Sequence, residues 1–303
     1  MKALHLEQYG RVATNVRAVH RLPWLIAGFS LLVAACSSAA STFPDDAIAI
    51  RVNSEVAAGN ERLLVAVSQL DGTRLGSPVD RVRLAVAPES DPSRVQTVDA
   101  VFDWTIEDAF GFYRGEFAFD QLGLWQLTVV PEEGDPLDTV LFEVQGDACR
   151  LEGAAAPCAP RVGEPAPSLF TPSLDTASLA DLTTDGSPDE RFYRLSLDDA
   201  LANGRPTVVV FSTPAHCRTA TCGPILENLK TVVGDFPGFD FVHIEIYTGL
   251  QQPDFAPDPS HVAAAVTAWA LPSEPWVFVT DASGVITARF EGTLSAVELR
   301  ARL

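Results

Sequence analysis

Two cysteines, Cys217 and Cys222, stand five positions apart, shortly after the apolar run Val208 to Phe211. Cysteine thiolates attack disulfides and bind soft metals, so a close pair points to redox or metal chemistry. A metal site would need C-x2-C spacing with further cysteine or histidine ligands nearby, and this pair lacks that surrounding pattern. The pair therefore predicts thiol–disulfide chemistry without a bound metal or other cofactor.

The spacing of the pair places a condition on the helix that follows. In a regular α-helix, residues i and i+5 have Cα atoms about 8.6 Å apart. A disulfide requires Cα atoms within about 7 Å of each other. Proline is tolerated in a first helical turn, and Pro224 follows closely. We therefore expect the helix to begin between Ala220 and Cys222, with Cys217 in an irregular segment before it.

Cys217 is the predicted nucleophile, and Cys222 is the predicted resolving cysteine. The unpaired N–H groups and the dipole of a helix N-terminus would stabilise a thiolate at Cys217. His216, when protonated, and Arg218 would add positive charge beside it. Glu245 lies in the next predicted strand. If it is buried near Cys217, its pKa is raised and it can accept a proton; a surface salt bridge is the alternative role.

The N-terminus predicts an extracytoplasmic location. Residues 1–22 carry four basic residues and one acid, and the 13-residue apolar run PWLIAGFSLLVAA follows. This run is too short to span a bilayer and is typical of a secretory signal peptide. It ends in VAAC, which resembles a bacterial lipobox, a resemblance that implies cleavage after residue 35 and lipidation of Cys36. We expect residues 36–46 to tether the chain to the membrane.

The charge of the chain argues against several classes of partner. The full sequence has a formal net charge of −19, and removal of residues 1–35 makes it −22. A surface this acidic repels nucleic acid and anionic lipid headgroups, so we expect no nucleic-acid partner.

Cys149 and Cys158 form a second candidate pair. They lie in the Gly/Ala/Pro-rich segment 146–161, which we interpret as a linker. An even number of remaining cysteines in an oxidising compartment favours two disulfides. A Cys149–Cys158 bond would stabilise the linker; a second redox pair that passes electrons to Cys217 and Cys222 is the alternative.

Residues 47–145 have the pattern of an all-β domain. Short strand-like runs alternate with turn-forming residues. The runs are AIAIRV, RLLVAVSQ, RVRLAVAP, VQTVDAVFDW, FYRGEFAF, LWQLTVV and TVLFEVQ. Seven such strands in about 100 residues predict an immunoglobulin-like β-sandwich. Its role would be that of a spacer or a docking surface.

Residues 162–303 have an α/β pattern. A capping box at Ser196 and Asp199 begins a short helix, and TVVVF at residues 207–211 is a continuous apolar run typical of a buried strand. The strand FDFVHIEIY, the helix SHVAAAVTAWA, the hairpin WVFVTDASGVITARF and the helix SAVELRARL follow. This order predicts a sheet covered by helices on both faces.

Four segments of this half resemble proteins of the thioredoxin-like superfamily. GEPAPSL resembles the start of thioredoxin-like lipoproteins and peroxiredoxins, and GRPTVVVFSTPAHC their strand before the active site. CGP echoes the thioredoxin motif, and LPSEPWVFVTDASGVITARFEG resembles the segment with a cis-proline. The resemblance implies that Pro275 is that cis-proline and lines the groove for a client. It also implies a buried acid near the cysteines, for which Glu245 is the candidate.

The resemblance leaves several activities open. Membrane-anchored thioredoxins use C-x2-C to exchange disulfides with client proteins, whereas this chain has C-x4-C. Atypical two-cysteine peroxiredoxins do use C-x4-C, but Thr213 stands four residues before Cys217 rather than three. Copper chaperones of cytochrome oxidase assembly use C-x3-C and a distant histidine, for which His216, His243 and His261 are candidates. A structural disulfide in a binding module is a fourth alternative.

The sequence therefore predicts two domains, an immunoglobulin-like β-sandwich followed by an α/β thioredoxin-like domain. The expected activity is a thiol–disulfide oxidoreductase, lipid-anchored outside the cytoplasm of a bacterium. Its expected partners are client proteins that carry thiols or disulfides, together with the membrane that holds Cys36.

Overall fold

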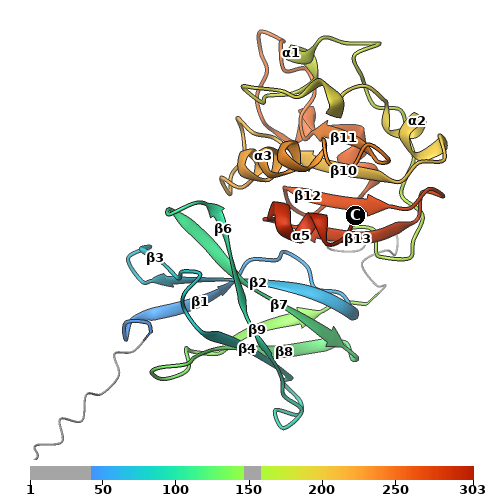
Figure 1. The fold of residues 1–303 in the computed structure, drawn as a ribbon. Coiled ribbons are helices and arrows are strands. Elements are labelled where there is room, and N and C mark those ends of the chain that lie inside the picture. Colours follow the sequence, from blue (N-terminus) through green and yellow to red (C-terminus); the bar gives the residue numbers. More distant parts are fainter. Residues whose placement is uncertain (1–41, 147–157) are drawn as a thin grey trace, which may run out of the picture. The chain divides into compact units, whose positions relative to one another are not determined.

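The computed structural model describes residues 42–146 and 158–303 (Figure 1). The predicted signal peptide, the lipidation site Cys36 and the linker residue Cys149 lie outside these ranges, so those assignments stay predictions. Strands dominate the regular structure, and the helices are few and short. Within the two described ranges, no helix has the length and apolar character needed to cross a bilayer.

Residues 47–144 form two antiparallel sheets that fit a sandwich. The first has the order β1-β2-β7-β6, with β3 also paired to β2, and the second has the order β5-β4-β8-β9. The first sheet comprises β1 (Ala47–Arg51), β2 (Gly59–Gln69), β3 (Arg74–Leu75), β6 (Val101–Ile106) and β7 (Phe110–Phe119). The second comprises β4 (Val82–Pro88), β5 (Gln96–Asp99), β8 (Gly123–Pro131) and β9 (Val140–Val144).

Both sheets contribute to one apolar core. Leu63 and Val65 of β2 pack in the same cluster as Trp125 and Leu127 of β8. Along β8, buried positions alternate with more exposed ones, which is the two-residue period of a strand with one covered face.

One predicted strand is two strands in the structure. The run at residues 95–104 divides at Ala100, because β5 pairs with β4 in one sheet and β6 pairs with β7 in the other. A bend of this kind lets a chain pass from one sheet of a sandwich to the other. The two-residue strand β3 was also missed, since it lies inside a segment rich in turn-forming residues.

The third sheet holds the strand that leads to the cysteines. Its order is β11-β10-β12-β13, with β10 parallel to β11 and antiparallel to β12. The strands are β10 (Thr207–Ser212), β11 (Asp240–Glu245), β12 (Trp276–Thr280) and β13 (Ile286–Glu291). Every residue of β10 is buried, as its continuous apolar sequence predicted.

Helices cover both faces of this sheet. Val208 and Val210 of β10 pack in one cluster with residues of α3 and α5, while Val209 and Phe211 pack in another with residues of α2 and α4. The helical elements are α1 (Leu179–Leu182), η2 (Glu190–Phe192), α2 (Leu197–Ala202), α3 (Cys222–Val232), η3 (Pro259–His261), α4 (Ala264–Ala268) and α5 (Ala296–Arg300). The predicted strands and helices of this half occur in the predicted order, and α1, η2 and η3 are short additional elements that the sequence pattern did not predict.

The helix expected at residues 260–270 is shorter than its sequence pattern suggested. Val262 forms an isolated bridge with Tyr247, and Ala263 donates its N–H to the Ile246 carbonyl at 2.8 Å. These bonds hold Val262 and Ala263 in an extended conformation between η3 and α4, so α4 begins only at Ala264.

Candidate active site

Cys217 and Cys222 are joined by a disulfide, with Cα atoms 5.9 Å apart. Helix α3 begins at Cys222, and Cys217 lies in the irregular segment before it. The late helix start predicted from the five-residue spacing is therefore confirmed. It places Cys217 outside the regular helix, where the Cα separation can fall within the range that a disulfide requires.

The two sulfur-bearing residues differ in accessibility. Cys222 has no exposed surface, whereas Cys217 is partly exposed. The backbone N–H of Cys222, the first of helix α3, donates to Cys217 Sγ across 3.2 Å. An unpaired N–H at a helix start stabilises negative charge. The geometry therefore suits Cys217 for attack from outside and Cys222 for resolution from inside.

Pro275 lies beside the end of β10. Trp276 pairs with Phe211, so Pro275 follows the β12 register toward the segment that carries Cys217. The Glu274–Pro275 peptide bond is cis, as the resemblance implied. The Pro275 ring is buried, so it offers little surface to a client, and its role in a groove stays a prediction. Burial raises the pKa of Glu274, while the neighbouring Arg218 opposes this rise.

Glu245 is buried at the end of β11, with 6% of its surface exposed. Burial raises the pKa of its carboxyl group, and hydrogen-bonding groups on Thr213 and Thr184 oppose this rise only in part. Its Oε2 accepts the Thr184 N–H at 2.8 Å and the Thr184 hydroxyl at 2.9 Å. Its Oε1 is buried and has no hydrogen-bond partner within the described residues. The surface salt bridge considered for Glu245 is thus not the arrangement found.

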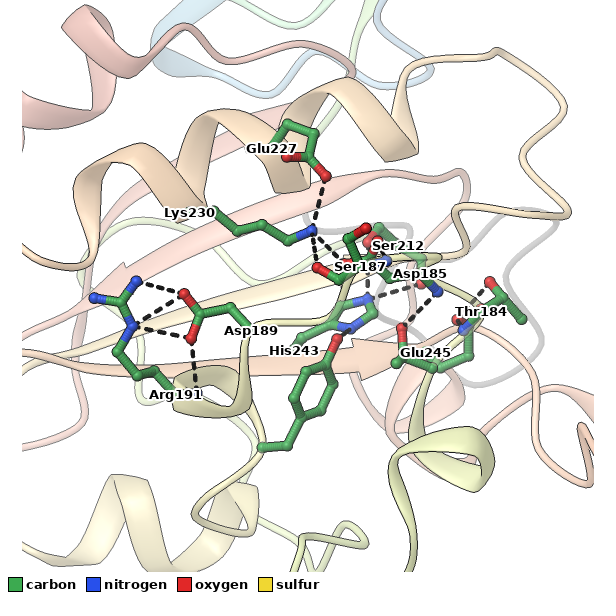
Figure 2. A network of polar contacts seen from close by, with 12 residues as sticks. Thr184, Asp185, Ser187, Asp189, Arg191, Ser212, Glu227, Lys230, His243 and Glu245 are labelled. Carbon is green, nitrogen blue, oxygen red and sulfur yellow. Dashed lines mark hydrogen bonds and ion pairs between the residues drawn. The ribbon is translucent and has the colours of Figure 1, made fainter.

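Thr184 connects Glu245 to the segment that precedes the nucleophile. The same hydroxyl that donates to Glu245 accepts the backbone N–H of Ala215 at 3.1 Å, two residues before Cys217. The next residue, Asp185, pairs with Lys230 of α3 at 2.5 Å. Figure 2 shows this short segment between the strand and the helix. Sequence reasoning missed it, because nothing in the pattern of residues 183–187 marks a contact with β11.

His243 has a structural environment. Its ring nitrogens hydrogen-bond to the Tyr193 hydroxyl at 2.9 Å and to the Ser212 hydroxyl at 2.8 Å, as Figure 2 shows in part. Burial lowers the pKa of the imidazole to about 4, so the ring is neutral at pH 7. With both nitrogens engaged, His243 is a poor candidate for the copper ligand considered from the sequence.

His216 and Thr213 are relevant to the copper-chaperone and peroxiredoxin alternatives, respectively. The His216 ring packs against Phe255, with ring centroids 5.3 Å apart. Thr213 is fully buried, and the hydroxyl in contact with Cys217 Sγ is that of Thr219, at 3.4 Å. Among residues 42–146 and 158–303, no group of three or more His, Cys, Asp or Glu side chains is arranged to hold a metal.

Cys158 is buried and disulfide-bonded. Its predicted partner, Cys149, lies outside the described residues, so the pairing and its proposed linker role stay predictions.

Comparisons with known proteins find resemblances at the level of solved structures. No protein-family model matches the chain, and no curated protein matches it either. A thiol:disulfide interchange protein of the thioredoxin family from Chlorobium tepidum aligns with a TM-score of 0.32 and 20% identity, over 47% of this chain and 95% of the other. The ZirS C-terminal domain aligns with a TM-score of 0.22 and 13% identity, over 48% and 95% of the two chains.

Proposed function

We propose that this protein is a thiol–disulfide oxidoreductase whose redox centre is the Cys217–Cys222 pair. The observation that carries the proposal is the asymmetry of the pair at the start of α3. The sulfur-bearing residue that a client can reach is Cys217, and it receives the first N–H of the helix, while Cys222 is fully buried behind it. A purely structural disulfide has no need for this arrangement.

The exchange balances as follows. In the reduced protein, the Cys217 thiolate attacks one sulfur of a client disulfide, and the other client sulfur leaves as a thiolate. The Cys222 thiolate then attacks Cys217 Sγ, which forms the internal disulfide and releases the second client thiolate. The client is reduced by two electrons and the pair is oxidised by two; the reverse sequence oxidises a client dithiol.

Glu245 is the proposed proton acceptor. A buried carboxyl group with a raised pKa can take the proton that Cys222 must lose before it attacks. The Thr184 hydroxyl, bonded both to Glu245 and to the Ala215 backbone, would hold the carboxyl group against the active-site segment.

The proposal extends to the layout of the whole chain. Residues 47–145 would be an immunoglobulin-like domain, and residues 162–303 a thioredoxin-like domain with Pro275 at its client groove. Lipid on Cys36 would anchor the protein outside the cytoplasm, where client proteins carry disulfides. The element order of the third sheet and the cis peptide before Pro275 support the second assignment.

The test is the reduction potential of the Cys217–Cys222 pair, measured by equilibration against glutathione with both Cys149 and Cys158 replaced by Ala. A value between about −270 and −120 mV, the range of exchange catalysts, is expected. A value below about −300 mV would identify a stable structural disulfide and overturn the proposal.

A further inference from the structure

The segment between the two cysteines contains two hydroxyl groups arranged in series toward the reactive sulfur. Thr219 Oγ1 lies 3.4 Å from Cys217 Sγ, and Thr221 Oγ1 lies 2.7 Å from Thr219 Oγ1. If the Thr219 hydroxyl donates to the sulfur, its oxygen remains free to accept the Thr221 hydroxyl proton. The two bonds are then compatible with each other and polarise in the same direction.

In the described part of the chain, the Thr221 side chain does not make the capping hydrogen bond that is usual for a threonine at its position. It is the N-cap residue of α3, where a Thr side chain usually accepts an N–H from the first helical turn. Its side chain makes no such bond within the described residues, and it points its hydroxyl to Thr219 instead. The Thr221 side chain is also buried, so a hydrogen bond to solvent does not account for its orientation toward Thr219.

The backbone between the two threonines is held in an unusual conformation. Ala220 has a φ of 60°, in the left-handed region that residues other than glycine seldom adopt. Such strained residues persist where the surrounding structure over-determines them, and they cluster at functional sites. Here the left-handed residue separates the two hydroxyls that form the chain to Cys217.

A thiolate gains more from these groups than a disulfide does. A disulfide sulfur is a weak, neutral acceptor, whereas a thiolate carries a full charge and forms a stronger, charge-assisted hydrogen bond. We propose that Thr219 is a catalytic residue whose hydroxyl donates to the Cys217 thiolate, and that Thr221 is the positioning residue that orients it. This inference rests on the proposed function, and it names the residues that set the redox balance of the pair.

The direction of the effect follows from the state that is stabilised. A donor that favours the thiolate lowers the thiol pKa of Cys217 and favours the reduced pair over the disulfide. Removal of the Thr219 hydroxyl should therefore raise that pKa and make the reduction potential more negative. A hydrogen bond to a charged group supports a pKa change of about one unit. At a pH above both thiol pKa values, that change becomes up to a tenfold shift in the redox equilibrium, or about 30 mV.

The experiment compares Thr219→Val with Thr219→Ser, Thr221→Val and Thr267→Val in the full chain. Thr219→Val removes the hydroxyl and keeps the shape, Thr219→Ser restores the hydroxyl, and Thr267 is an exposed residue of α4 that serves as the matched control. The thiol pKa of Cys217 is read from the pH dependence of its alkylation by iodoacetamide, resolved by peptide mass spectrometry. The potential of the pair is read against glutathione.

We expect the pKa and potential shifts for Thr219→Val, a smaller shift in the same direction for Thr221→Val, and values close to wild type for Thr219→Ser and Thr267→Val. A Thr219→Val protein that titrates like wild type overturns the inference, as does an equal shift in the Thr267→Val control. Neither readout needs a client. If Thr219→Val shifts the pKa and the potential but the wild-type protein does not exchange disulfides with a client, only the proposed function is refuted. If the wild-type protein exchanges disulfides but Thr219→Val causes no shift, only the role of Thr219 is refuted.

Discussion

The two sheets of residues 47–144 and the sheet of residues 207–291 bury their strands in different ways. In β8, buried side chains alternate with more exposed ones, so polar groups of that strand can face water. In β10, every residue is buried, and so are the polar residues His243 and Glu245 of β11. Ser212, His243 and Glu245 can therefore find partners only inside the protein. Ser212 bonds to His243 and Glu245 Oε2 accepts from Thr184, whereas Glu245 Oε1 has no hydrogen-bond partner among the described residues.

This difference indicates where chemistry can be placed. In a sheet with one open face, polar side chains can hydrogen-bond to water and do not need partners within the protein. A sheet covered on both faces forces buried polar groups into specific hydrogen bonds, and burial changes their pKa values. The lowered pKa of His243 and the raised pKa of Glu245 both have burial as their largest cause.

The largest expected effect is the loss of activity when either cysteine next to the third sheet is replaced. Replacement of Cys217 by Ser removes the exposed sulfur, so reduction of a protein disulfide by the chain should be abolished. Cys222→Ser should instead accumulate a mixed disulfide between Cys217 and the client, because the resolving thiol is gone. Insulin reduction and non-reducing mass spectrometry measure the two results. Undiminished reduction by the Cys217→Ser protein would contradict the assignment of the nucleophile.

The next effect concerns the core of the first two sheets. Trp125 is fully buried and donates its indole N–H to the Gln121 carbonyl. Trp125→Ala should lower the free energy of unfolding by about 3–5 kcal/mol through loss of burial and creation of a cavity. Urea denaturation followed by circular dichroism measures this.

The exposed neighbour Leu124 provides the control, since Leu124→Ala should change stability by no more than about 0.5 kcal/mol. Alkylation of Cys217 in the folded Trp125→Ala protein should proceed at the wild-type rate. A changed rate would show that the core around Trp125 influences the redox pair, and the contrast between the two regions would then weaken.

The smallest effect is a pH dependence caused by Glu245. Its pKa in the folded protein is raised above the ordinary value of 4.5, so the folded state binds its proton more tightly than the unfolded state does. Its favourable contribution is complete below pH 4.5 and is lost as the pH rises toward the folded-state pKa. Glu245→Gln should remove this loss, because the amide carries no charge to bury, and should stabilise the protein at pH 8 by about 1–3 kcal/mol, the desolvation cost of a buried polar or charged group.

Urea denaturation at pH 4 and pH 8 measures this difference between Glu245→Gln and wild type. Glu227→Gln, on the exposed side of α3, is the matched control. A stability gap for Glu245→Gln that is as large at pH 4 as at pH 8 would argue that the carboxyl charge is not the cause.

The sequence predicted the parts of the fold that depend on local pattern. Continuous apolar residues predicted β10. The five-residue spacing of the cysteines and Pro224 predicted that α3 begins between Ala220 and Cys222, and it begins at Cys222. The division at Ala100 was not predictable in this way, because it depends on the pairing of β5 with β4 and of β6 with β7, which are tertiary contacts. The start of α4 was misjudged for a similar reason, since the bridge between Val262 and Tyr247 is a tertiary contact.

The site was predictable to the same extent. The types and spacing of Cys217 and Cys222 predicted the disulfide-bonded pair, whereas the strand position of Glu245 left its burial and a surface salt bridge both open. Thr184 lies 61 residues before Glu245 in the chain, and no periodicity marks it as a partner. The hydroxyls of Thr219 and Thr221 meet across Ala220, whose left-handed conformation is not predictable from the sequence.

The turn between β12 and β13 is far from this chemistry along the sheet. Asp281 Oδ1 accepts the N–H groups of Ser283 and Val285, so the turn closes on itself. Because β12 is antiparallel to β10, Thr280 lies beside Thr207, at the end of β10 opposite to Cys217. The exposed tip at Ser283 is therefore a suitable point for inserting an epitope or a fluorescent reporter, because the Cys217–Cys222 disulfide lies beyond the opposite end of β10.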